Sequence, residues 1–222
     1  MKLGVLGGTF DPIHLAHLRL CEEFREALAL DRVVLVPAGD PPLKREGVTP
    51  ARHRLEMVRR AIAANPGLEV DDLELRRPGP SYTVDTLAEL RARHPDAELW
   101  FLLGADALAD LESWRQPARL LELANFAVAT RPGYVRPLRE LLPRALATPF
   151  RDATLGGRPG LLHANGNELR AVSWTPLEIS ASEIRRRAAA GESIRYLVPD
   201  DVREYIAKHH LYSQPHQERE DD

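Results

Sequence analysis

The sequence predicts an α/β protein, a Rossmann-like doubly wound and mainly parallel sheet with helices on both faces and a small C-terminal helical subdomain. Three observations support this prediction. The expected strands are continuous apolar runs, which is typical of strands that are buried on both faces. These runs alternate with helical patterns along the chain. The length of 222 residues suits one hydrophobic core. We therefore expect one domain over residues 1–212, with its helical part at about 180–212.

Strands and helices follow one another closely in the first half of the chain. The first strand is expected at residues 3–6, and Leu18, Cys21 and Phe24 lie on one face of the helix that follows. Thr49 provides an N-cap for a later helix. The other elements expected here are a strand at 32–36, a helix from 50 to about 64, an extended segment at 68–75, a helix of about twelve residues from 83, and a strand at 98–103.

The second half predicts weaker strands and shorter helices. Residues 137–146 have the pattern of one amphipathic helix, and residues 156–160 that of a flexible turn. The other expected elements are helical stretches near 108 and at 117–123, strands at 126–129, 161–163 and 171–174, and helices from 180 and at 199–210. Residues 213–222 are polar and acidic, so we expect a disordered tail there.

Composition excludes several classes of protein. The net charge of −3 gives no support for a nucleic-acid surface, and we expect no nucleic-acid partner. No apolar run is long enough to cross a membrane, and no signal peptide opens the chain. The one cysteine, Cys21, cannot form an internal disulfide. These features predict a cytoplasmic protein, and they leave both a monomer and a homodimer open.

A glycine turn and two histidines follow the first strand. Gly7 and Gly8 allow a tight turn in which backbone N–H groups are accessible to an anion. The next helix points its unpaired N–H groups and positive dipole end at the same place. His14 and His17 are three residues apart, so both imidazoles can face one side of that helix. This arrangement predicts a phosphate site in which imidazoles stabilise developing charge.

Other interpretations of this stretch are less well supported. A zinc site needs further ligands, and neither His-Glu-x-x-His nor a Cys/His cluster is present. The glycine pattern is neither the Rossmann dinucleotide fingerprint nor the Walker loop. A second candidate phosphate site is the helix start at residues 180–185. Ser180 can cap that helix with Glu183 completing a capping box, while Arg185 can hold phosphate oxygens.

The whole string Gly-Gly-Thr-Phe-Asp-Pro-Ile-His-x-x-His resembles the signature of nucleotidyltransferases with two histidines at the first helix. It is most similar to bacterial nicotinate-mononucleotide adenylyltransferases. Pro-Pro-x-Lys at Lys44 and Ile-Ser-x-Ser-x-Ile-Arg at Arg185 resemble two further motifs of that family. Ala16 stands where the family usually has Gly, and Leu43 where it commonly has His. The likeness covers roughly residues 2–212, and residues 151–160 are its least distinctive part.

The resemblance implies roles for particular residues. His14, His17, Lys44 and Arg185 would be catalytic. ATP would be bound by Gly7, Gly8, Thr9, Phe10, His14, His17, Gly104, Asp106, Ser180, Ser182 and Arg185. Nicotinate mononucleotide would be bound by Thr9, Lys44, Thr83, Trp114 and Arg131. The cofactor would be Mg²⁺, held mainly by substrate phosphates rather than by protein side chains.

The implied reaction is adenylyl transfer from ATP to nicotinate mononucleotide, which gives nicotinate adenine dinucleotide and pyrophosphate. No protein nucleophile is required, so catalysis would consist of positioning and charge stabilisation. Alternatives are nicotinamide mononucleotide or another phosphate-bearing acceptor, and a nucleotide-binding module without turnover. A redox protein that uses a finished dinucleotide lacks its glycine fingerprint.

Overall fold

The structure, a computed structural model, describes residues 1–41, 47–133 and 137–213. Its centre is an eight-stranded sheet in the order β3-β2-β1-β4-β5-β8-β7-β6. The strands are β1 (Lys2–Gly8), β2 (Arg32–Pro37), β3 (Leu68–Val70), β4 (Glu98–Gly104), β5 (Asn125–Thr130), β6 (Phe150–Leu155), β7 (Arg158–His163) and β8 (Glu168–Ser173). Strands β1 to β5 and β8 pair in parallel, and β6 and β7 add antiparallel pairs at one edge. The mainly parallel α/β fold is confirmed.

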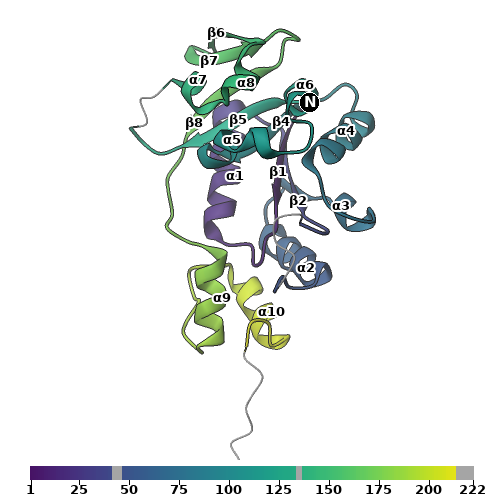
Figure 1. Ribbon diagram of the computed structural model, residues 1–222. Coiled ribbons are helices and arrows are strands. Elements are labelled where there is room, and N and C mark those ends of the chain that lie inside the picture. The colour runs from purple at the N-terminus through teal and green to yellow at the C-terminus, as the bar shows by residue number, and fades with distance from the viewer. Residues whose placement is uncertain (42–46, 134–136, 214–222) are drawn as a thin grey trace, which may run out of the picture.

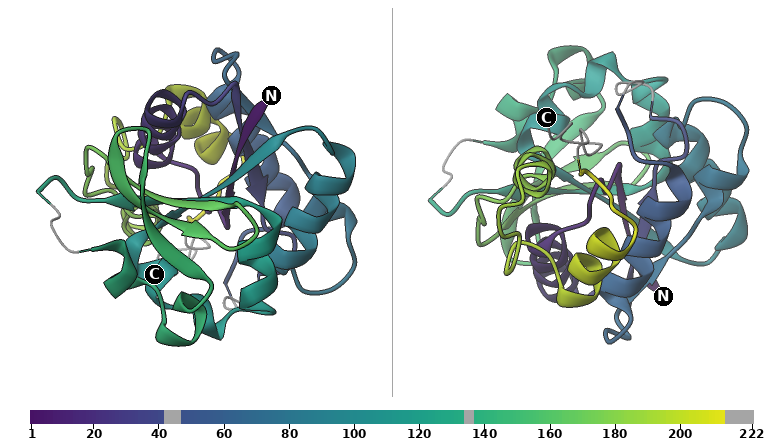
Figure 2. Two further views of the ribbon diagram at one scale, coloured as in Figure 1. Left: turned by 90° about the horizontal axis from the view of Figure 1, so that it is seen from above. Right: turned by 90° about the horizontal axis from the view of Figure 1, so that it is seen from below.

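Helices cover both faces of this sheet (Figures 1 and 2). The longer ones are α1 (Leu15–Leu28), α2 (Ala51–Ile62), α4 (Thr83–Arg93), α9 (Ala181–Ala189) and α10 (Asp200–Lys208). The shorter ones are α3 (Leu73–Arg76), α5 (Ala105–Ala109), η1 (Leu111–Ser113), α6 (Pro117–Leu123), α7 (Leu138–Leu141) and α8 (Arg144–Ala147). None of the helices described is long and apolar enough to cross a membrane.

Two hydrophobic cores lie on opposite faces of the sheet. One contains Val5 and Phe101 and is covered by α4, α6 and the short helices between β4 and β6. The other contains Cys21 and Trp100 and is covered by α1, α2 and α10. Both faces of the strands are therefore buried, which explains their continuous apolar sequence.

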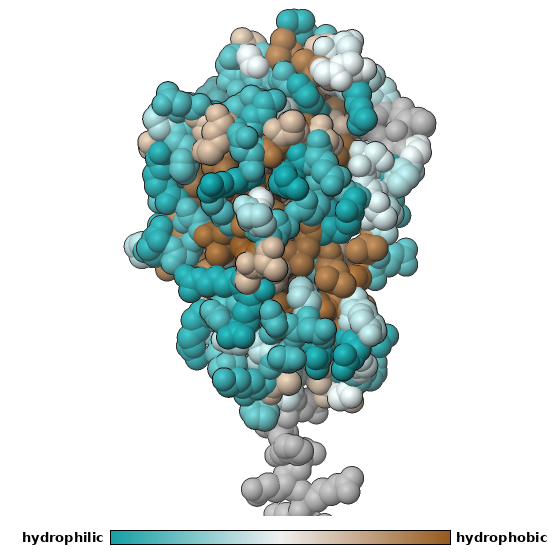
Figure 3. Space-filling view, turned by 180° about the vertical axis from the view of Figure 1, so that it is seen from behind, coloured by the Kyte–Doolittle hydropathy of each residue, from teal (hydrophilic) through white to brown (hydrophobic). Residues whose placement is uncertain are grey.

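The two C-terminal helices lie at the end of the sheet where β1 finishes (Figure 1). Ile184 of α9 and Val202 of α10 are fully buried in the same core as α1 and α2, so these helices are packed onto the domain. Seen from behind, the surface is mostly hydrophilic, with apolar side chains gathered between the body and this helical part (Figure 3).

Three predicted elements differ from the structure. The segment at 68–75 is extended only in β3, since α3 begins at Leu73. The single helix at 137–146 is two short helices, because Pro143 interrupts it. The turn at 156–160 is confined to Gly156 and Gly157, and the flanking residues form the β6–β7 hairpin. The predicted disordered tail, residues 213–222, lies outside the described residues except for Ser213.

A smaller difference lies at the start of α2, where Thr49 does not cap the helix. The N-cap is Pro50, and no side chain caps this end. The N–H group of Thr49 instead donates to the carboxylate of Asp11, and its carbonyl oxygen accepts from Arg54. This residue therefore links two segments rather than beginning a helix.

Candidate active site

The first loop, residues 9–13, connects β1 to α1 at the carboxyl end of the sheet. Gly8 precedes it, and a Cβ at Gly8 would lie 2.9 Å from the ring of Phe10, so the missing side chain makes room for this ring. Phe10 has a left-handed backbone with φ 48° and is buried. Gly7 is exposed, and a Cβ there would approach only the ring of Phe101, at 4.0 Å. The glycines therefore serve different purposes: Gly8 accommodates Phe10, and Gly7 keeps the backbone accessible.

The two imidazoles of the predicted pair lie against each other. The rings of His14 and His17 are stacked with centroids 3.7 Å apart, and the edge of Phe10 supports the second ring at 5.1 Å. The backbone N–H group of His14 donates to Nδ1 of His17 at 3.3 Å. A neutral imidazole that accepts at Nδ1 carries its proton on Nε2. His17 can therefore donate from Nε2 to an oxygen atom.

His14 is much more buried than its partner, with 6% of its surface exposed. Burial lowers the pKa of His14 to about 4, because the charged imidazolium loses its hydration. Its Nδ1 atom is buried and has no hydrogen-bond partner among the described residues. A buried polar atom of this kind costs free energy unless a ligand or water satisfies it. The imidazole of His14 therefore lies at the start of α1 with one ring nitrogen unsatisfied in the part of the chain that the structure describes.

Arg185 connects the C-terminal motif to the first loop. Its Nη1 donates to the carbonyl oxygen of Asp11 at 2.7 Å. Ser180 caps α9, since its hydroxyl accepts from the N–H group of Glu183 at 3.2 Å. Glu183 does not complete the predicted capping box, because its carboxylate pairs with Arg186 and Arg187 instead. The hydrogen bond from Arg186 lowers the pKa of Glu183 to about 2. The start of α9 therefore has the Ser180 cap but not the reciprocal Glu183 contact, and Ser182 beside it is exposed.

The remaining predicted contacts follow neighbouring strand ends. Strand β4 pairs with both β1 and β5, so Gly104 and Arg131 lie along the same edge as the first loop. Gly104 caps α5, in whose first turn Asp106 is exposed. Arg131 is exposed directly after β5. Lys44, with Leu43, lies outside the described residues.

Thr83 and Trp114 lie on the face of the sheet opposite to α1 and α2. Thr83 is the first residue of α4. Trp114 is half-buried and packs edge-on against Phe101, with ring centroids 6.1 Å apart. The guanidinium of Arg115 lies 4.5 Å from the centre of the Tyr82 ring. Because Arg115 follows Trp114 and Tyr82 precedes Thr83, this contact brings Trp114 close to the start of α4.

A buried network supports this start of α4. The hydroxyl of Thr86 donates to the carboxyl of Glu74 at 2.5 Å, and the N–H group of Gly39 donates to the Ser81 hydroxyl at 3.0 Å. Glu74 is 7% exposed, and burial raises its pKa. A Cβ at Gly39 would lie 2.3 Å from the carbonyl oxygen of Glu74, so only glycine allows this approach.

Sequence reasoning did not identify three residues that organise the site. Arg54 is 1% exposed and donates to three carbonyl oxygens, those of Thr9, Gly39 and Thr49. Its position one residue before Leu55, on the apolar side of α2, is a signal that could have indicated a buried guanidinium. Asp11 belongs to the first motif, but the motif pattern gives it no role of its own. Tyr212 follows the last helix, and no local pattern distinguishes it.

These features form a candidate phosphate site at the carboxyl edge of a doubly wound α/β sheet. Residues 5–187 match the Cytidylyltransferase-like family. The chain is 47% identical over 214 residues to the "Probable nicotinate-nucleotide adenylyltransferase" of Citrifermentans bemidjiense, covering 96% of this chain and 98% of that protein. It is 45% identical to the protein of the same name from Thermomicrobium roseum, covering 95% and 91%. The chain belongs to the cytidylyltransferase-like family, in its nicotinate-nucleotide adenylyltransferase group.

Solved structures confirm the fold independently. The nicotinic acid mononucleotide adenylyltransferase of Plasmodium falciparum, complexed with NaAD, matches with a TM-score of 0.72 at 20% identity, covering 95% of this chain and 97% of that one. The putative nicotinate-nucleotide adenylyltransferase from Vibrio parahaemolyticus matches with a TM-score of 0.64 at 16% identity, covering 97% and 98%. At these identities the likeness concerns the fold.

Proposed function

We propose that this protein transfers the adenylyl group of ATP to nicotinate mononucleotide, giving nicotinate adenine dinucleotide and pyrophosphate. The observation that carries the proposal is the stacked pair of His14 and His17 at the end of β1, in a chain with full-length relatives of that name. The pair combines a buried imidazole without a hydrogen-bond partner at Nδ1, among the described residues, with a neighbouring Nε2 donor. A protonated ring nitrogen of either imidazole can donate to a phosphate oxygen.

The reaction needs no covalent intermediate on the protein. An oxygen of the acceptor's 5′-phosphate forms a bond to the α-phosphorus of ATP, and the bond from that phosphorus to the bridging oxygen breaks. The electron pair leaves with pyrophosphate. His14, His17, Lys44 and Arg185 would hold the phosphate oxygens during this step, so that positioning and charge stabilisation lower the barrier.

In free protein His14 is neutral near pH 7, because burial lowers its pKa to about 4. It would therefore meet ATP as a neutral imidazole. Phosphate charge beside the ring favours the imidazolium and raises the pKa on binding. Binding of the nucleotide would thus favour the charged form of His14.

Mg²⁺ would be the metal ion of the reaction and would neutralise phosphate charge. In the described part of the chain, His, Cys, Asp and Glu side chains form no group of three that could hold a metal. The exposed carboxylate nearest in sequence to a strand end of the site is Asp106, which suits a ribose. Mg²⁺ is a hard cation that prefers oxygen ligands, so it would reach the site on the phosphates of ATP.

Pyrophosphate release by purified protein with ATP and Mg²⁺ tests the proposal, using nicotinate mononucleotide, nicotinamide mononucleotide and phosphopantetheine as acceptors. Release with the nicotinate acceptor and formation of the dinucleotide are expected. Release only with another acceptor would contradict the assigned substrate. ATP binding without release with any acceptor would instead favour a nucleotide-binding module.

A further inference from the structure

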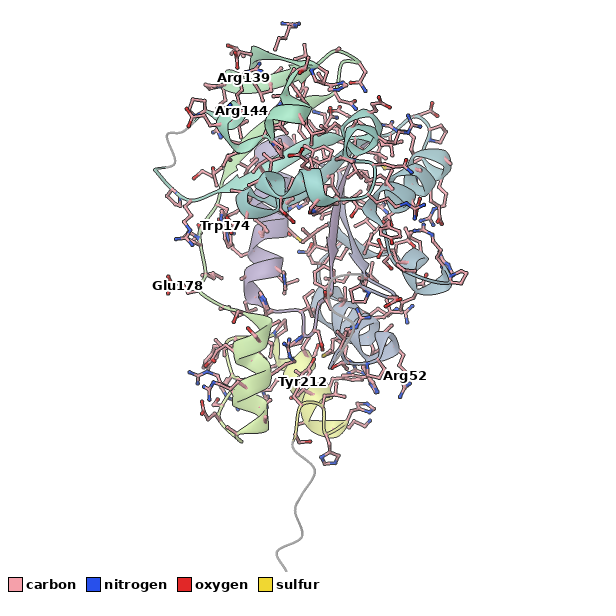
Figure 4. The ribbon with its side chains drawn as sticks, viewed as in Figure 1. Arg52, Arg139, Arg144, Trp174, Glu178 and Tyr212 are labelled. Atoms are coloured by element: carbon pink, nitrogen blue, oxygen red, sulfur yellow. The ribbon has the colours of Figure 1, made fainter. Side chains whose placement is uncertain are left out.

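The C-terminal end of the described chain returns to the first loop. After α10, His210 and Tyr212 both have left-handed backbones, with φ 49° and 64°, and the N–H group of Leu211 donates to the carbonyl oxygen of Ile206 at 3.0 Å. This turn reverses the chain and places Tyr212 between α9 and α10 at the end of the sheet (Figure 4). The phenol hydroxyl of Tyr212 donates to Oδ1 of Asp11 at 2.7 Å, across 201 positions of sequence.

Asp11 is the residue through which this contact acts. It is 4% exposed, and its two carboxylate oxygens accept from different parts of the chain: Oδ1 from Tyr212, and Oδ2 from the N–H group of Thr49 at 3.1 Å. Its backbone carbonyl accepts from Arg185. A buried carboxylate needs all of its partners, since the loss of one donor leaves a desolvated charge poorly paired.

The protonation of Tyr212 suits it to this role. Burial raises the pKa of the phenol well above its ordinary value, and the hydrogen bond to Asp11 raises it further. The hydroxyl therefore keeps its proton and remains a donor throughout the physiological range. Arg54 is a buried cation that interacts with both groups, and its guanidinium donates to three carbonyl oxygens.

The first loop is held by contacts with distant segments of the chain. Phe10 holds a left-handed backbone that a non-glycine residue adopts only when its surroundings fix it. Asp11 lies three residues before His14, which opens α1. Only two residues separate Asp11 from His14, so a displacement of Asp11 would act on the start of α1 over a short stretch of chain.

We propose that Tyr212 is a positioning residue for the active site: through its hydrogen bond to Asp11 it fixes the first loop and hence His14 and His17. The C-terminal turn, residues 210–212, is then part of the catalytic machinery and not only of the packing of α10. The effect on turnover rests on the proposed adenylyl transfer, whereas the effect on the first loop does not.

The test compares Tyr212→Phe with Tyr205→Phe. Each variant removes one phenol hydroxyl from the C-terminal region, but the hydroxyl of Tyr205 contacts Nδ1 of His53 at 2.9 Å and not the first loop. Hydrogen–deuterium exchange is measured on residues 9–17, together with kcat, KM for ATP and the free energy of unfolding. For Tyr212→Phe we expect faster exchange in this segment and a fall in kcat of about tenfold to a hundredfold, the scale of misplaced catalytic groups. For Tyr205→Phe we expect neither.

A second variant, Asp11→Asn, is combined with Tyr212→Phe in a double-mutant cycle. If Tyr212 acts through Asp11, the effects on kcat are less than additive; additive effects would overturn that route. Unchanged exchange in Tyr212→Phe overturns the proposal whether or not the enzyme turns over. Faster exchange with unchanged kcat in an active enzyme refutes the positioning role. Faster exchange when wild-type protein releases no pyrophosphate with any acceptor would preserve the loop support and refute the proposed function.

Discussion

His14 and His17 have the same side chain but different surroundings, and their chemistry differs accordingly. His14 is buried and neutral, with an unsatisfied Nδ1 among the described contacts, whereas His17 is half-buried and accepts a backbone hydrogen bond at Nδ1. The spacing of three residues predicts that both rings face one side, which the stacked geometry confirms. It does not predict which ring is buried, because that depends on the distant segments packed over the start of α1.

Replacing His17 with Ala is expected to lower kcat by roughly 10²–10³, the scale of one lost preorganised donor. The half-buried ring contributes little core, so the variant is expected to fold. Steady-state pyrophosphate release measures the first effect, and urea unfolding the second. A folded His17→Ala protein with near-normal turnover would remove His17 from the mechanism.

His14 predicts a loss of stability in mild acid. Its pKa is about 4 in the folded protein against an ordinary 6.5, so the unfolded chain binds the proton more readily between these values. The free energy of unfolding that depends on neutral His14 is complete above pH 6.5 and falls as the pH approaches 4. Between pH 7 and pH 5 the loss is about 2 kcal/mol.

The variant His14→Gln lacks this titration, so its loss of stability over the same interval is expected to be about 2 kcal/mol smaller. Urea unfolding at the two pH values measures the difference. Equal pH dependence in His14→Gln and wild type would show that His14 is not held neutral.

At the scale of elements, α2 is tied to the site by one side chain. Arg54 holds the carbonyl oxygens of Thr9, Gly39 and Thr49, which belong to the first loop, the segment after β2 and the approach to α2. Arg54→Met is expected to cost about 3–5 kcal/mol of unfolding free energy, because three buried acceptors lose a charged donor.

Arg52 offers a matched control on the same helix. It is exposed, and Figure 4 shows it at the outer side of α2. Arg52→Met is expected to change the free energy of unfolding by no more than about 0.5 kcal/mol. Urea titration of both variants decides the question: similar small losses would mean that the three carbonyl contacts do not support the site.

Local sequence predicted most elements but not their junctions. Apolar runs and helix starts indicated β1, β2, β4, α6 and α9, because burial on both sides and capping act on neighbouring residues. Strand β6 was missed, since half of Phe150–Leu155 is exposed and the segment lacks a clear apolar pattern, whereas β7 was predicted only at 161–163. Pro143 divides a segment whose periodicity alone suggests one helix.

The site shows the same division. The glycines, the two histidines and Arg185 belong to short motifs that can be recognised locally. The contacts of Asp11 with Thr49 and Tyr212 span 38 and 201 positions, and no periodicity in one segment indicates a partner so far away. Long-range hydrogen bonds of buried polar groups are set by the whole fold.

At the scale of the whole molecule, the chain is expected to need its C-terminal turn but not the residues that follow it. Deleting residues 214–222 should leave Tm and kcat nearly unchanged, because a polar, acidic segment of this composition buries little surface. Thermal melting and pyrophosphate release measure both. Deletion from Tyr212 onward is the comparison, and it is expected to lower kcat. A clear loss on removing residues 214–222 alone would mean that the tail contributes to the fold or the site.

The preference between the nicotinate and nicotinamide acceptors is expected to depend on the start of α4 and on Trp114, which come from separate segments of the chain. Thr83 is the first residue of α4, Trp114 follows η1, and both side chains are half-buried. Backbone N–H donors at a helix start suit a carboxylate, which accepts on both oxygens. A carboxamide would turn its NH₂ group toward one of these donors and leave the pair unsatisfied.

That mismatch costs on the order of 1–3 kcal/mol, so nicotinate mononucleotide is expected to exceed the nicotinamide acceptor by about tenfold to a few hundredfold in kcat/KM. Stacking does not separate the two, because both rings present the same face to Trp114. Trp114→Ala should therefore weaken both acceptors while their ratio changes less. Measuring kcat/KM for both nucleotides, with wild type and this variant, gives the answer. Equal or better use of the amide by wild type would contradict the acid preference and leave adenylyl transfer itself intact.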